Sequence, residues 1–143
     1  MMERLLEPDV SIYEPGFLLW LHREFYERLP ESMRVAKTRS GERYEIVPGA
    51  YRDFMVDVSR HTPPHFEKLP AFMVRFCRFY GGGEIHETDR LVAIAAAHHR
   101  LAWIHPFGDG NGRVVRLYSQ AMLFRHGLDQ TRLGRGIDRE PRA

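Results

Sequence analysis

The chain has little of what several classes of protein require. Its only cysteine is Cys77, so an intrachain disulfide framework is excluded. Apolar runs are too short for a membrane span, and no signal-like apolar region follows the charged N-terminus. The formal net charge is only +2, and the basic residues are spread along the chain, which does not indicate nucleic-acid binding. We therefore expect a soluble cytoplasmic protein with neither a membrane nor a nucleic-acid partner.

Apolar residues recur at helical spacing over most of the chain, and 143 residues suffice for one hydrophobic core. The predicted fold class is mainly α, with a Ser40-Gly41 turn before a short alternating stretch at 44–47. Three glycines at 81–83 end one of the helices. The helices are predicted over residues 16–29, 69–80, 91–104 and about 111–126.

Residues 105–116 read His-Pro-Phe-Gly-Asp-Gly-Asn-Gly-Arg-Val-Val-Arg, and no core requires this combination. Pro106 should end the preceding helix, because proline disfavours helical geometry in the residue before it. The next helix should begin near residue 111 or 112, so the run places free backbone N–H groups at a helix N-terminus, which favours anions. Glycines permit a tight turn at three positions: Gly108, Gly110 and Gly112.

The polar side chains of this run suit a nucleotide phosphate. Arg113 and Arg116 are three residues apart and share one helix face, where their guanidinium groups can bind phosphate oxygens. Asp109 offers an oxygen ligand for Mg²⁺. His105 can accept a proton near neutral pH. The chemistry we infer is attack by a hydroxyl on a nucleotide phosphate, with His105 as the base.

This run resembles the defining motif of the Fic family, His-Pro-Phe-x-(Asp/Glu)-Gly-Asn-Gly-Arg-x-x-Arg, with every fixed position matched. The resemblance covers about residues 48–128 and implies a single Fic domain over 1–143, folded as a helical bundle with a small β-hairpin flap. Residues 58–64 resemble that flap, which docks the target segment. The flap residues carried over are Val58, Ser59, Arg60 and His61.

Most Fic proteins transfer AMP from ATP to a Ser, Thr or Tyr hydroxyl of another protein. The resemblance therefore implies ATP as a substrate, Mg²⁺ as a cofactor and a protein as the partner. It makes His105 the general base and Asp109 the metal ligand. It also implies that a loop cradle and two arginines bind the nucleotide phosphates. The cradle is Gly108, Gly110, Asn111 and Gly112, and the arginines are Arg113 and Arg116.

Two other functions stay open at this point. A truncated remnant, or a nucleotide-binding partner without catalysis, would keep the cradle, and a Fic enzyme could transfer another phosphate-containing group such as phosphoryl, UMP or phosphocholine. The intact His105 and Asp109 favour the enzyme. Many Fic proteins carry an inhibitory glutamate that pairs with the second arginine of the motif, but its sequence pattern is not found here. An inhibitory partner chain is therefore one expectation.

The last residues of the chain, 129–143, are polar and broken by glycine, and we expect them to be irregular or truncated. The helix at 111–126 is apolar on more than one side and needs cover nearly all round. We therefore expect homo-oligomers, a completing partner chain or low stability.

Overall fold

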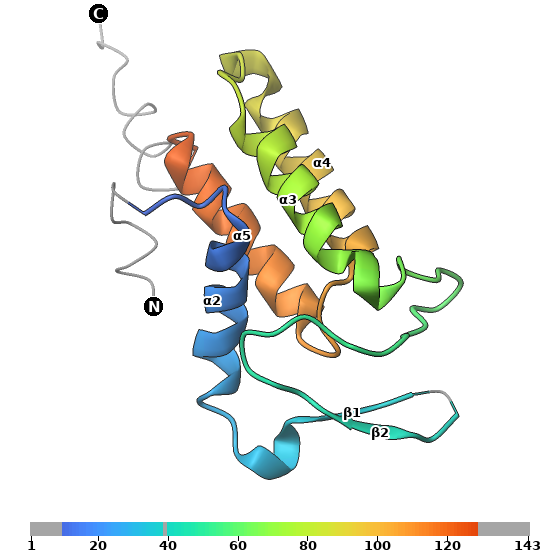
Figure 1. The fold of residues 1–143 in the computed structure, drawn as a ribbon. Helices are drawn as coiled ribbons and strands as arrows, with labels where there is room; N and C mark the ends of the chain where they lie inside the picture. Colours follow the sequence, from blue (N-terminus) through green and yellow to red (C-terminus); the bar gives the residue numbers. More distant parts are fainter. Residues whose placement is uncertain (1–9, 39, 129–143) are drawn as a thin grey trace, which may run out of the picture.

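The computed structural model describes residues 10–38 and 40–128, which form a mainly helical domain (Figure 1). The predicted fold class is confirmed, and the predicted helix ends agree with the structure within three residues. A two-stranded antiparallel sheet and three short 3₁₀ segments complete the described part. The helices are α2 (Pro15–Tyr26), α3 (Leu69–Gly81), α4 (Arg90–Ile104) and α5 (Asn111–Arg125), the strands β1 (Val35–Lys37) and β2 (Arg43–Glu45), and the 3₁₀ segments η1 (Glu31–Met33), η2 (Phe66–Lys68) and η3 (Glu87–Asp89).

Proline and glycine set the helix ends that matter for function. α4 ends at His105, which adopts a left-handed conformation with φ of 51° just before Pro106. α5 begins after Gly110, whose φ of 81° favours glycine, and it ends before Gly127, whose φ is 70°. The loop between α4 and α5 is therefore fixed by its own sequence at both ends.

α5 lies in the middle of the helices and contacts both α2 and α4, while α3 packs against α4 (Figure 1). The central core is built from apolar faces of all four helices. Its fully buried members include Leu18, Leu21, Leu69, Met73, Leu101, Phe107, Tyr118 and Met122. A smaller cluster of Tyr26, Ile46 and Phe54 connects the sheet region to the loop before α5.

The strands lie in a different segment from the predicted flap. β1 pairs with β2 in the register Val35↔Glu45, around the predicted Ser40-Gly41 turn. The flap at 58–64 has one bridge, Val58↔His61, so it is a tight turn rather than an extended hairpin. Proline has no N–H to donate, and residues 63 and 64 are both proline, which ends the pairing there.

The sequence predicts that α5 needs cover nearly all round, and in the described part of the chain α5 has none of the large exposed apolar side chains. Homo-oligomers, a completing partner chain and low stability stay predictions. α2 covers α5 on one side, and residues just before α2 reach its C-terminal end. There Tyr13 Oη lies 3.1 Å from His126 Nε2, and Arg125 donates to the carbonyl of Val10. The large exposed apolar side chains of the four helices lie on α3 and α4: Val74, Phe79, Leu91, Val92 and Trp103. Three more are exposed outside these helices: Met33, Val47 and Met55. The predicted irregular tail at 129–143 lies outside the described residues.

Among the described helices, none has the length and the apolar character that a membrane span requires.

Candidate active site

A side chain from α5 closes the loop that carries the motif. The backbone N–H of Phe107 donates to Asn111 Oδ1 at 2.9 Å, and Asn111 Nδ2 donates to the carbonyl of Phe107 at 2.7 Å. Asn111 is buried, so both polar atoms of its amide are used within the loop. Only its backbone N–H is left for the predicted phosphate cradle.

Two glycines let this loop pack tightly against other segments. A Cβ at Gly108 would lie 2.6 Å from Ile46 Cδ1 and 2.7 Å from Phe54 Cζ. A Cβ at Gly110 would lie 2.6 Å from a ring carbon of Tyr26. Side chains at these positions would push the loop away from α2 and from the segment after β2.

A pocket of about 270 Å³ lies at the start of α5. The first N–H groups of a helix have no intrahelical acceptor and carry the positive end of its dipole, so this position favours an anion. The pocket brings together the motif residues that the sequence predicted, and the flap residues are not among those that line it. The lining consists of His105, Gly108, Asp109, Gly110, Asn111, Gly112, Arg113 and Arg116.

His105 is half-buried at the end of α4, with Nδ1 3.4 Å from the carbonyl oxygen of Ala102. A carbonyl only accepts, so Nδ1 carries the proton in this hydrogen bond and Nε2 stays available as a base. Burial lowers the pKa of His105 below its ordinary value; the Ala102 carbonyl opposes this shift, and the positive charge of Arg52 adds to it. His105 is therefore neutral at pH 7, as a general base must be.

Asp109 is exposed on the loop and is held in place by two residues of α2. Tyr26 Oη donates to Asp109 Oδ2 at 2.5 Å. His22 Nε2 lies 3.2 Å from the Asp109 carbonyl oxygen, and His22 Nδ1 accepts from the Gly49 N–H at 2.9 Å. The Gly49 bond places the His22 proton on Nε2, which donates to Asp109. The sequence analysis missed both residues, although their spacing of four on α2 could have indicated a shared face.

His22 should make the domain acid-sensitive. It is fully buried between the rings of Tyr26 and Phe107, with centroids 4.4 and 4.1 Å away, and burial lowers its pKa from 6.5 to about 4. Between these values the unfolded chain binds a proton that the folded chain does not. The free energy of unfolding should therefore fall as pH drops from 6.5 towards 4, by up to about 3 kcal/mol.

Urea unfolding at neutral pH and at a pH of about 4.5 measures this loss. The variant His22→Gln should show a smaller dependence on pH than the wild type, while His99→Gln, which changes an exposed histidine of α4, should keep it. Equal losses for the wild type and His22→Gln would show that another group is responsible.

The buried Arg52 connects the flap segment to the motif loop. It is only 4% exposed, and its guanidinium donates to the carbonyls of Phe54 at 2.9 Å, Pro64 at 2.6 Å and His105 at 2.9 Å. Its backbone N–H donates to the carbonyl of Pro106 at 3.0 Å. Phe54 and Pro64 bracket the flap, so a single side chain positions both the flap and the backbone of His105. Arg52 was not predicted from the sequence, because its partners are backbone carbonyls, which every residue carries and which therefore form no sequence pattern.

The flap turn lies against the end of α4. Val58 and His61 exchange two backbone hydrogen bonds, of 3.0 and 2.9 Å, and Ser59 and Arg60 are exposed at the tip. His61 Nε2 lies 2.8 Å from the carbonyl oxygen of Trp103, two residues before His105. The flap is thus near the predicted base although it does not line the pocket.

The two motif arginines extend from the first turns of α5. Arg113 Cζ lies 4.5 Å from the centroid of the Phe25 ring, a cation–π contact that directs its side chain. An Arg116 Nη1 atom lies near Gly112, 3.4 Å from where a Cβ would stand, so the side chain reaches back towards the helix N-terminus. Within residues 10–38 and 40–128, neither guanidinium forms an ion pair with a carboxylate.

Known proteins are similar to this chain in sequence and in fold. Curated relatives called "Protein adenylyltransferase Fic" include one from Nematostella vectensis, 37% identical over 88 residues that cover 62% of this chain and 21% of the relative. Another, from Drosophila mojavensis, is 32% identical over 107 residues, which cover 75% of this chain and 21% of the relative. The chain thus spans about a fifth of the length of these relatives.

A solved structure of a Fic family protein from Desulfovibrio desulfuricans G20 has a TM-score of 0.65 at 26% identity. The match covers 86% of this chain and 33% of that one. The model of the Fic/DOC family matches residues 13–123, a range that contains the whole pocket, the flap and the supporting residues of α2. The chain therefore belongs to the Fic/DOC family.

Proposed function

We propose that this domain is a protein adenylyltransferase, which transfers AMP from ATP to a Ser, Thr or Tyr hydroxyl of a target protein. The observation that carries the proposal is the single pocket shared by a neutral histidine, a carboxylate, a helix N-terminus and two arginines. The names of the curated relatives support the same activity.

In this proposal the α5 N-terminus, Arg113 and Arg116 hold the phosphates of ATP. The target hydroxyl oxygen attacks the α-phosphorus, and its proton moves to His105 Nε2. The new bond joins the hydroxyl oxygen to phosphorus, the bond from the α-phosphorus to the bridging oxygen breaks, and pyrophosphate leaves. The flap at 58–61, beside the end of α4, would dock the target segment.

The residues present suit Mg²⁺ bound together with ATP. Asp109 is exposed, and Tyr26 binds only its Oδ2, which leaves Oδ1 for a cation. The described residues contain no group of three His, Cys, Asp or Glu side chains that could enclose a metal by themselves. One carboxylate is enough for Mg²⁺ when substrate phosphates and water complete its octahedral shell. There the ion would neutralise phosphate charge.

The position of a radioactive label in ATP tests the function. Incubation with protein substrates should transfer label from α-labelled ATP and none from γ-labelled ATP. Transfer from γ-labelled ATP alone would show phosphoryl transfer. Transfer from neither label would contradict AMP transfer and favour either the remnant that binds nucleotide without catalysis or an enzyme that transfers UMP or phosphocholine from another donor. AMP transfer should also release one pyrophosphate for each α-label transferred to protein.

Substitutions of Asp109 and Arg116 should separate metal contacts from phosphate contacts. Arg116→Ala should weaken ATP binding with or without Mg²⁺, by roughly 10- to 150-fold, because a hydrogen bond from a charged group contributes about 1.5–3 kcal/mol. Asp109→Ala should weaken only the binding measured with Mg²⁺, or should abolish turnover. Calorimetric titrations with and without Mg²⁺ measure both effects. Unchanged titrations for both variants would place the nucleotide elsewhere.

A further inference from the structure

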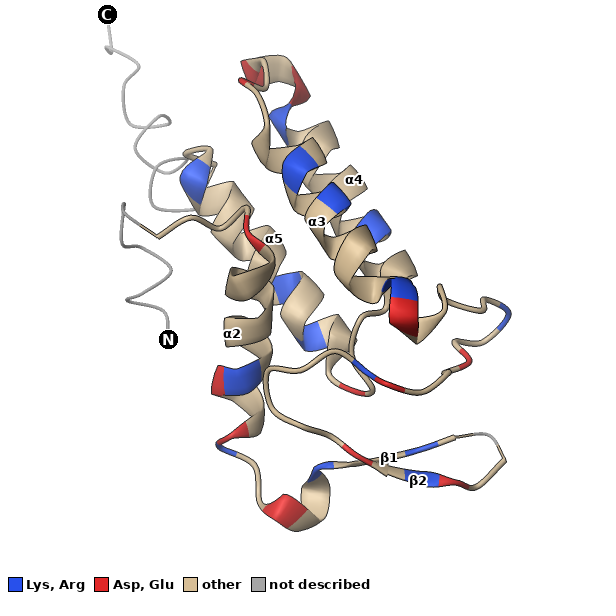
Figure 2. Ribbon diagram, in the orientation of Figure 1, with Lys and Arg blue, Asp and Glu red and all other residues tan. Residues whose placement is uncertain are grey.

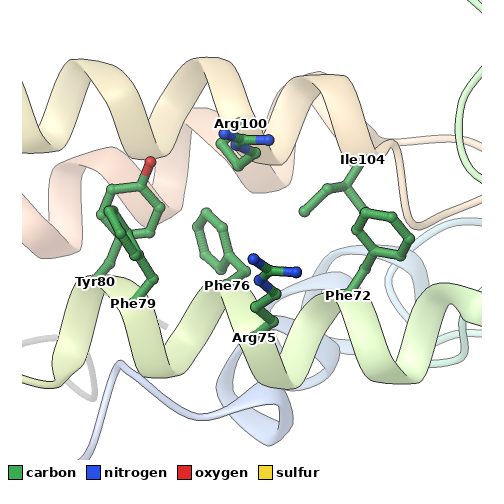
Figure 3. A pocket seen from close by; sticks show the side chains of 7 residues that line it. All are labelled: Phe72, Arg75, Phe76, Phe79, Tyr80, Arg100 and Ile104. Carbon is green, nitrogen blue, oxygen red and sulfur yellow. The ribbon is translucent and has the colours of Figure 1, made fainter.

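A second pocket, of about 280 Å³, lies between α3 and α4 and shares no lining residue with the active-site pocket (Figure 3). Its floor contains the rings of Phe72 and Phe76. Arg75 and Phe79 stand on its α3 side and Arg100 on its α4 side. We call the surface formed by these five residues the α3–α4 groove.

Apolar side chains around the groove are exposed to an extent that a core does not explain. Phe79 is 78% exposed, and Val74, five residues before it on α3, is 48% exposed. At the other end of the groove Trp103 is 37% exposed, with its ring centroid 6.2 Å from that of Phe72. Contiguous apolar surface with a polar rim marks an interaction site on soluble proteins.

The charge of the groove is entirely positive. Figure 3 shows Arg75 on α3 and Arg100 on the facing α4, and Arg100 Cζ lies 6.0 Å from the centroid of the Trp103 ring. The described residues that line the pocket include no Asp or Glu, and neither arginine forms an ion pair with a described carboxylate. Arg78 adds a third positive charge beside Phe79, and Figure 2 shows acidic residues of this region only towards the ends of the two helices. The fold thus gathers arginines that are scattered in the sequence.

The shape of the groove fits a helix. Phe72, Phe76 and Phe79 lie within two turns of α3, a length of about 10 Å. A groove between two packed helices accepts the apolar side of a third, through anchors at positions i, i+3 or i+4, and i+7. Carboxylates beside those anchors would reach Arg75 and Arg100, since arginine binds carboxylates with paired hydrogen bonds.

A second copy of this chain is a poor occupant of the same surface. A two-fold symmetric interface brings a patch against itself. Here that would set Arg75, Arg78 and Arg100 against their own equivalents, with no described carboxylate between them. Like charges placed together oppose association.

We propose that the α3–α4 groove is a docking site for an acidic amphipathic helix of a protein partner. The apolar side of that helix covers Phe72 and Phe79, above the buried Phe76, and its carboxylates pair with Arg75 and Arg100. This surface is separate from the nucleotide pocket, so the proposal stands or falls independently of AMP transfer.

Two synthetic peptides test the proposal. Both have about 16 residues, long enough for a helix, with leucines at i, i+4 and i+7 on an alanine background. One carries glutamates beside the leucines and the other carries lysines. Fluorescence anisotropy with the full chain should show that the acidic peptide binds at least tenfold more tightly, because the groove attracts one charge and repels the other.

Variants of the groove make the test specific. The double change Arg75→Glu with Arg100→Glu should weaken binding of the acidic peptide by roughly tenfold or more and reverse the preference in favour of lysine. Phe79→Ser, which changes an exposed residue, should also weaken binding, and it serves if the double variant does not fold. Arg43→Glu on β2 reverses one charge outside the groove and should leave binding unchanged.

Several results would overturn the proposal. These are equal affinities for the two peptides, no detectable binding of the acidic peptide, or equal effects of Arg43→Glu and the groove variants. A labelled single-stranded oligonucleotide that binds the groove more tightly than the acidic peptide would make nucleic acid the ligand. Self-association in sedimentation that Phe79→Ser abolishes would assign the groove to a second copy.

Discussion

Replacing His105 with alanine should slow AMP transfer by roughly a hundred- to ten-thousand-fold, the usual contribution of a positioned general base. The structure gives the reason. Nδ1 keeps its proton and donates it in a hydrogen bond to the Ala102 carbonyl, so Nε2 has a free lone pair. Burial lowers the pKa of the ring so that it is neutral at pH 7. Single-turnover transfer from α-labelled ATP to a protein substrate measures the rate.

The same variant should bind ATP with nearly the affinity of the wild type, because the imidazole is no phosphate ligand in this scheme. His99→Ala, on the exposed surface of the same helix, is the matched control and should transfer AMP at the wild-type rate. A His105→Ala protein with full transfer activity would contradict the assignment. Equal losses of transfer and of ATP binding would instead make His105 a binding residue.

The pH profile gives an independent readout of the same base. Protonation of His105 removes the lone pair, and the folded pKa lies below the ordinary value of 6.5. The acid limb of kcat/KM should therefore lie below pH 6.5 for the wild type and disappear from the residual activity of His105→Ala. An acid limb that persists in the variant would belong to another group.

The helices could be predicted because their signals are local. Pro106 and Gly127 terminate α4 and α5 at positions the sequence marks, and the Gly81–Gly83 run does the same for α3. The residues of the motif pocket could also be predicted, since they all lie between residues 105 and 116. A loop closed between two such helices has few alternative conformations, so sequence order alone brings these side chains together.

The supporting residues could not be predicted in the same way, because their partners are distant in the sequence. Tyr26 binds Asp109 across 83 positions, and His22 binds the same residue across 87. A helical pattern shows that α2 has a buried face but not which segment covers it. The elements that cover α5 could not be predicted for the same reason: the sequence shows that α5 is apolar on several sides, and only the packing shows that α2 and α4 contact it.

Replacing Arg52 with lysine should lower the free energy of unfolding by about 3 to 6 kcal/mol. The guanidinium makes hydrogen bonds to three separate carbonyls, and a lysine ammonium group cannot reproduce this planar fork. If two of the three bonds are lost, at about 1.5–3 kcal/mol for each bond from a charged donor, several kcal/mol disappear. That is a large part of the stability of a small domain. Urea unfolding measures it, with Arg43→Lys on β2 as the matched surface control.

The same change should also reduce AMP transfer under conditions where the variant remains folded, because Arg52 binds the carbonyl of His105 and both ends of the flap segment. In the proposed scheme ATP is bound by Asp109, Arg113 and Arg116, which Arg52 does not contact, so the affinity for ATP should change little. A purely structural role would lower stability and leave the transfer rate of the folded fraction intact. A positioning role requires a lower kcat, or a higher KM for the protein substrate, in protein shown by circular dichroism to be folded. If kcat and the KM for the protein substrate keep their wild-type values, Arg52 contributes to stability and does not position the site.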